Sequence, residues 1–110
     1  MYIYKDFMTD EALASQKRSV LRKLWMNIGQ IDVYLIFLST GPDQFDIIHT
    51  GVLKQKHYPK KDLYLLGAAK GWESAALLSG QLYESFRQKY DKTFFSGDIW
   101  RDRQTLFRRF

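Results

Sequence analysis

The chain has no cysteine, only two prolines and no apolar run long enough to cross a bilayer. The absence of cysteine excludes disulfides and thiolate metal sites, and it favours a reducing compartment. The first eleven residues contain four charged side chains and do not look like a signal peptide. We therefore expect a cytoplasmic protein without a membrane span.

Recognisable catalytic patterns are also missing. The chain holds two histidines, His49 and His57, and it contains no HExxH, GxSxG or phosphate-loop motif. His49 lies in an apolar segment, where a histidine is more often part of the core than a ligand. We expect no metal, no cofactor and no catalytic residues.

One enzyme class remains as an incomplete pattern. The order of elements expected below also occurs in the PD-(D/E)xK nucleases, and Pro42 and Asp43 supply a PD pair. That chemistry also needs a carboxylate followed two residues later by a lysine. Asp62 is followed at that spacing by Tyr64, so nuclease activity is not predicted.

The composition that is present indicates one folded domain, residues 1–110. Hydrophobic residues make up 45% of the chain and aromatic residues 16%. Of 17 basic and 12 acidic residues, 5 and 2 lie in residues 92–110, giving +3, which leaves 12 and 10, or +2, for residues 1–91. The basic, aromatic tail 92–110 is expected to pack on the domain or on a partner subunit.

A first helix is expected over residues 10–28. Thr9 can cap it, apolar side chains recur at helical spacing, and Gly29 can end it. Trp25 and Ile28 belong to the apolar stripe, so both are expected in the core.

A second helix is expected over Trp72–Tyr90, with Gly80 allowing a close approach to a neighbouring element. The small residues from Gly67 to Gly71 are expected to form the bend before it. Glu73 in the first turn would repel an anion, so this bend is interpreted as a connection and not as a phosphate site. A last short helix is expected over Ile99–Phe110.

Three strands are expected between the two long helices, over residues 31–39, 45–53 and 63–68. The first and third are apolar on both sides, so both faces of their sheet need cover. Short connections favour an antiparallel meander with both helices on one face. The predicted fold is α+β, with a three-stranded, mostly antiparallel sheet in the order α-β-β-β-α, and a short C-terminal helix or extended tail.

That arrangement leaves the second sheet face to the tail or to another copy of the chain. The leading hypothesis is therefore a small non-catalytic interaction domain that self-associates, as a homodimer, through that face, the tail or both. Aromatic residues favour interface centres. The candidate interface residues are Trp100, Leu106, Phe107 and Phe110.

A nucleic-acid-binding protein is the alternative. The segment 54–61 has four lysines in eight residues with an aromatic ring between them, and the tail adds four arginines among aromatic residues. The candidate contacts are Lys54, Lys56, His57, Tyr58, Lys60, Lys61, Arg101, Arg103, Arg108 and Arg109. A solvated loop and a packed tail explain the same charges without any ligand, and an acidic membrane surface is a weaker interpretation of the tail.

Overall fold

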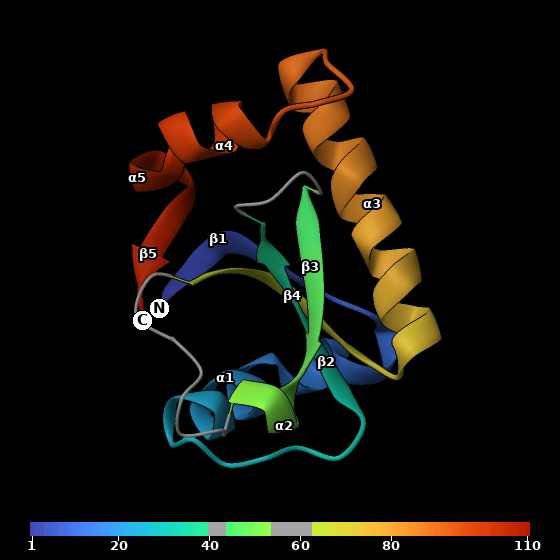
Figure 1. The fold of residues 1–110 in the computed structure, drawn as a ribbon. Helices are drawn as coiled ribbons and strands as arrows, with labels where there is room; N and C mark the ends of the chain where they lie inside the picture. Colours follow the sequence, from blue (N-terminus) through green and yellow to red (C-terminus); the bar gives the residue numbers. More distant parts are fainter. Residues whose placement is uncertain (40–43, 54–62) are drawn as a thin grey trace.

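The computed structural model describes residues 1–39, 44–53 and 63–110 (Figure 1). In chain order the elements are β1 (Tyr2–Thr9), the 3₁₀ helix η1 (Glu11–Gln16), α1 (Lys17–Trp25), β2 (Val33–Leu38), β3 (Phe45–His49), α2 (Thr50–Leu53), β4 (Tyr64–Lys70), α3 (Trp72–Tyr90), α4 (Ser96–Arg101), α5 (Arg103–Leu106) and β5 (Phe107–Arg109).

The strands form one mixed sheet in the order β3-β2-β4-β1-β5. β1 runs parallel to β4, and the other three pairings are antiparallel. The predicted α+β class is confirmed, but the predicted three-stranded sheet is wrong. The prediction lacks β1 and β5, the strands at the two ends of the chain. β1 pairs with β4 on one side and with β5 on the other.

The two long helices lie on opposite faces of the sheet, so the prediction of both on one face is wrong. One face packs against α3, and the other packs against η1, α1 and α2. The α3 face buries Tyr4, Ile36, Leu38, Leu66, Ala75, Leu78, Leu82 and Phe86, and the α1 face buries Ile3, Phe7, Leu13, Val20, Leu35, Phe37, Leu53 and Leu65. Because β2 and β4 are apolar on both sides, each face needs a helical layer, and the chain supplies one to each.

The N-cap of the first helical segment is Asp10 and not Thr9, and η1 begins at Glu11. The Leu13 amide donates to Asp10 Oδ1 at 3.2 Å, and the Lys70 amide donates to the other carboxylate oxygen at 3.1 Å. Thr9 itself is the last residue of β1. One carboxylate therefore caps η1 and also ties it to the end of β4.

The same segment ends before Gly29. Asn27 takes the left-handed conformation at φ 57°, its amide donates to the Leu24 carbonyl at 3.1 Å, and the Ile28 amide donates to the Lys23 carbonyl at 2.8 Å. These two bonds are the Schellman pattern of a helix end. Ile28 is 44% exposed as a result, and the prediction that it belongs to the core is wrong.

The predicted helix over Trp72–Tyr90 agrees with α3. The expected close approach at Gly80 is wrong, because a Cβ built there would meet nothing within 4 Å. The close approach is instead at Gly67, inside β4, where a Cβ would lie 2.6 Å from the Met8 carbonyl oxygen of β1. The expected bend is correspondingly shorter, because β4 continues to Lys70.

Two further predicted elements differ from the structure in length or in type. The strand predicted over residues 45–53 ends at His49, because the chain turns into α2 there, and the Thr50 hydroxyl donates to the Gln30 carbonyl at 2.9 Å. The helix predicted over Ile99–Phe110 is broken into α4, α5 and β5. Beyond β5, the Phe110 amide donates to the Met1 carbonyl at 3.1 Å, so the first and last residues are neighbours (Figure 1).

Candidate functional site

Six of the ten residues predicted to contact nucleic acid lie outside the described part of the chain. They are Lys54, Lys56, His57, Tyr58, Lys60 and Lys61, and Pro42, Asp43 and Asp62 lie outside it too. The other four are the arginines of the C-terminal segment. The structure gives these four different surroundings, and it brings two of them to one cleft.

Three side chains from neighbouring strands form a row on the α3 face of the sheet. Tyr2 of β1 is paired with Tyr64 of β4 on one side and with Arg109 of β5 on the other. Directly paired residues project to the same face of a sheet. The rings of Tyr2 and Tyr64 are stacked, with their centroids 4.7 Å and their planes 9° apart.

Helix α5 closes this row into a cleft of about 380 Å³. The cleft, called the Arg–Tyr cleft below, is lined by Tyr2, Tyr64, Arg103, Gln104, Phe107 and Arg109. Among the described residues, its lining contains two guanidinium groups and three aromatic rings, but no carboxylate. Such a surface attracts an anionic ligand, and its volume is in the range of small-ligand sites.

The two arginines of the cleft keep their charges available. Within the described residues, Arg103 and Arg109 take part in no ion pair, and both side chains are exposed. Arg103 Nη1 donates to the Trp100 carbonyl at 2.7 Å, which orients this guanidinium without neutralising it. Its remaining N–H groups can donate to a ligand.

Arg101 and Arg108 do not belong to the cleft. Arg101 is bound to two carboxylates: Nη1 lies 3.0 Å from Asp98 Oδ1, and Nε lies 3.1 Å from Asp102 Oδ1. Arg108 is paired with Ile3, which is buried on the α1 face, so its exposed side chain projects to that face. The structure therefore separates four arginines that look equivalent in the sequence.

The short helices that carry Arg103 are fixed by polar contacts. Lys92 Nζ donates to both oxygens of the nearly buried Asp98, at 3.0 and 3.1 Å. The Tyr90 hydroxyl donates to Asp102 Oδ2 at 2.8 Å, at the junction between α4 and α5. The pKa of Asp102 is lowered, first by hydrogen bonding to Arg101 and then by the Tyr90 hydrogen bond. These contacts set the position from which Arg103 enters the cleft.

Aromatic packing fixes the floor of the cleft. Tyr64 is 8% exposed, and its ring makes edge contacts with Trp100 and Phe107, with centroids 4.7 and 5.1 Å away. Leu106 and Phe107 are buried, and the partly buried Trp100 packs on the same core cluster. Phe110 packs on the α1 face. The four predicted interface residues thus contact the chain's own core, and their role between subunits stays a prediction.

The described residues contain no cluster of metal-ligating side chains. In ranges 1–39, 44–53 and 63–110, no group of three or more acidic or histidine side chains could hold a metal ion. His49 is partly buried, its Nδ1 accepts from the Gly51 amide at 2.9 Å, and its ring meets the edge of Tyr34. His49 is thus held by local contacts, but it is only partly buried and is not the core histidine that the sequence predicts.

In comparisons with known proteins, no family model, curated protein or solved structure matches this chain. Within the part of the chain that the structure describes, no helix is long and apolar enough to cross a membrane. The Arg–Tyr cleft is therefore the feature from which a function can be argued.

Proposed function

We propose that this protein binds single-stranded nucleic acid through the Arg–Tyr cleft. The observation that carries the proposal is the meeting of Arg103 and Arg109, which have no ion-pair partner in the described chain, beside the stacked rings of Tyr2 and Tyr64. Cationic groups beside aromatic rings are the two components with which proteins hold single strands.

The arginines supply the phosphate contacts. A guanidinium presents a planar fork of N–H donors that matches two phosphate oxygens, and its charge is permanent at any physiological pH. Arg103 and Arg109 reach the cleft from different elements, α5 and β5, so they are placed to hold a phosphate from two sides. No acid among the described lining residues opposes them.

The tyrosines favour a single strand over a duplex. Tyr64 is held edge-on by its neighbours, and Tyr2 stacks on it as the more accessible ring of the pair. A base can stack on such a ring only when its own face is uncovered, as it is in a single strand. The cleft volume of about 380 Å³ also suits a small part of a strand and not a double helix.

Fluorescence anisotropy with a labelled oligothymidylate tests the proposal. We expect binding at low salt that weakens steeply as salt is added, because each neutralised phosphate releases counterions. The double variant Arg103→Ala, Arg109→Ala should lose about tenfold or more in affinity, equivalent to about 1.4 kcal/mol. Its plot of log affinity against log salt should be shallower by about 1.4, or about 0.7 for each lost phosphate contact.

Arg87→Ala is the matched control. It removes one arginine, half of the charge that the double variant loses, from α3, where the Arg87 guanidinium is paired with Glu84. We expect this variant to bind like the wild type. Equal affinity of the double variant and the wild type, or no binding of oligonucleotide at low salt, would overturn the proposed function.

A further inference from the structure

Trp25 is a large apolar side chain that the fold leaves in solvent. It is the last residue of α1 and is 70% exposed, although its spacing predicted a place in the core. The stripe of α1 that does reach the core includes Val20, which is 2% exposed. Most of the surface of this ring is therefore accessible to a ligand.

The helix that carries this ring is basic. Arg18, Arg22 and Lys23 are exposed on α1, and the helix contains no acidic residue. Arg108 projects to the same face of the sheet from β5. The surface near Trp25 is therefore complementary to a polyanion, as the Arg–Tyr cleft is.

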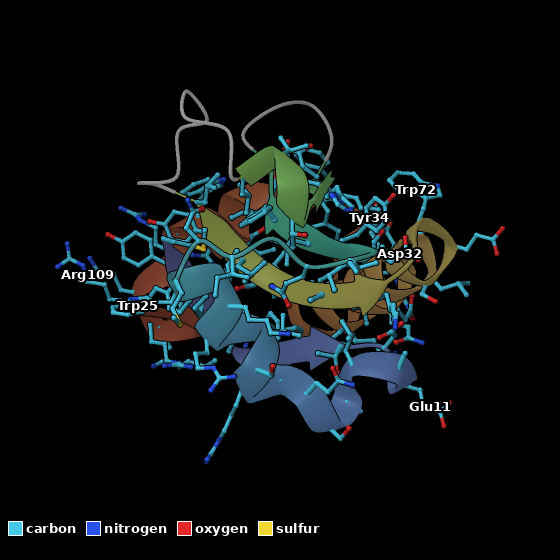
Figure 2. All side chains as sticks on the ribbon, turned by 90° about the horizontal axis from the view of Figure 1, so that it is seen from below. Glu11, Trp25, Asp32, Tyr34, Trp72 and Arg109 are labelled. Atoms are coloured by element: carbon cyan, nitrogen blue, oxygen red, sulfur yellow. The ribbon has the colours of Figure 1, made fainter. Side chains whose placement is uncertain are left out.

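Trp25 and the cleft lie at the same end of the molecule. Leu24 and Phe110, the neighbours of Trp25 and Arg109 in the chain, pack against the same core cluster. Figure 2 shows Trp25 and Arg109 at one end of the protein, with Trp72 at the opposite end. The cleft is on the α3 face and Trp25 is on the α1 face, and β5, which contributes to the cleft, is the edge strand of the described sheet.

From this arrangement we infer that a bound nucleic-acid strand leaves the Arg–Tyr cleft, crosses the sheet edge at β5 and stacks a second base on Trp25. The inference rests on the proposed function and extends it to a longer ligand. Arg109 and Arg108 point to the two faces of β5, so successive phosphates of a crossing strand meet one arginine on each face. Arg22, which lies three residues before Trp25 and so on the same side of α1, then lies beside the base on Trp25.

A membrane is the less favoured partner for this ring. Helices that lie in a bilayer surface present a whole apolar face to the lipid. The apolar face of α1 is used inside the protein, with Val20 buried and Leu21 and Leu24 packed against the core. What remains outside is an aromatic ring among cations, which suits stacking on a base.

The length of the oligonucleotide separates the two sites. We expect Trp25→Ala to weaken binding of a twelve-nucleotide oligothymidylate by about tenfold, which is within the range for loss of one stacked base. The same variant should bind a dinucleotide, which fills the cleft alone, like the wild type. Trp25→Phe keeps a stacking ring and should recover most of the lost affinity.

Trp72→Ala is the control, because Trp72 is 55% exposed but lies at the opposite end of the molecule, next to Glu73. We expect it to bind both oligonucleotides normally. Equal affinity of Trp25→Ala and wild type for the long oligonucleotide would overturn the inference, even with the arginine effects intact. Loss of binding to phosphatidylserine vesicles in Trp25→Ala, with oligonucleotide binding unchanged, would overturn it in favour of a membrane.

Discussion

Arginine occurs four times in the last ten residues of the chain, and nearby carboxylates decide which of the four can hold a ligand. Arg101 lies between Asp98 and Asp102 and is bound to both. Arg103 lies one residue beyond Asp102, but its guanidinium turns away to the Trp100 carbonyl and the cleft. The spacing of Asp98 and Arg101, three residues apart in a helix, is the signal in the sequence that could have separated Arg101 from the others.

The Tyr90–Asp102 hydrogen bond gives stability a dependence on pH. Burial raises the pKa of Tyr90, and the hydrogen bond to Asp102 raises it further. A tyrosine whose pKa is raised in the folded protein contributes to the free energy of unfolding. This contribution is complete below the ordinary tyrosine pKa, about 10, and is lost as the pH rises through the pKa of the folded protein. We expect Tyr90→Phe to unfold at lower urea than the wild type at neutral pH, and to lose less stability in alkali. Urea unfolding followed by circular dichroism measures both.

Asp102→Asn tests the contacts of Asp102 from the acid side, because the pKa of Asp102 is lowered first by the hydrogen bond from Arg101 and then by the one from Tyr90. The lowered pKa of Asp102 contributes stability that is present above the ordinary aspartate pKa, about 3.9, and is lost as the pH falls through the folded pKa. The variant should therefore lose less stability in acid than the wild type. Wild-type pH profiles in both variants would show that the contact does not persist in solution.

At the scale of elements, the pairing of β1 with β4 brings two backbones unusually close. The position that a Cβ of residue 67 would occupy is 2.6 Å from the Met8 carbonyl oxygen and 3.3 Å from Leu78 Cδ2. β1 also has a register shift between Ile3 and Met8. Only glycine fits at position 67, because its missing side chain leaves room for the displaced carbonyl.

Two glycine substitutions should therefore have opposite effects. Gly67→Ala places a methyl group against the β1 backbone, and we expect it to lower the free energy of unfolding by about 1–3 kcal/mol. Gly80→Ala meets nothing within 4 Å, and it should raise the free energy of unfolding by about 1 kcal/mol because alanine favours the helix. Chemical denaturation of the two variants measures this. A harmless Gly67→Ala would contradict the close approach of β1 to β4.

Elements with a local signal could be predicted from the sequence, and those that depend on distant partners could not. The α3 bounds follow from periodicity within one segment. β1 was missed because Lys5 and Asp6, both exposed, interrupt its apolar alternation. β5 has only three residues, two of them arginines, and it forms because β1 offers a free edge.

The candidate site could be predicted only in part, for the same reason. Arg103 and Arg109 were predicted as ligand contacts from charge and aromatic neighbours. Tyr2 and Tyr64 were not, because these rings stack only through the parallel pairing of β1 with β4. The alternation of Tyr2 and Tyr4 at the start of the chain is a weak strand signal, and it would have pointed to β1.

At the scale of the whole molecule, the chain covers both faces of its own sheet. α3 lies over one face, and η1, α1 and α2 lie over the other. The sequence argument for self-association assumed that the second face was open, and that premise does not hold in the described structure. The homodimer predicted from the sequence therefore loses its main support.

Light scattering at high salt tests the homodimer directly. Because both faces are covered and Leu106 and Phe107 are buried, we expect a monomer of 13.1 kDa. A stable dimer would instead need exposed apolar side chains such as Trp72 and Leu77 of α3, which are 55% and 72% exposed. Such a dimer would support the interaction-domain hypothesis, and Leu77→Glu should then dissociate it.

The hydrogen bond between Phe110 and Met1 has a mechanical consequence. β1 and β5 are antiparallel, so a force that pulls the two chain ends apart loads their hydrogen bonds one after another, as in opening a zipper. Bonds loaded in series give way at low force. The first pairs to separate would be those that hold Arg109 beside Tyr2. A nucleic-acid strand bound across that sheet edge would hold β1 and β5 together, and it would raise the force needed to separate them.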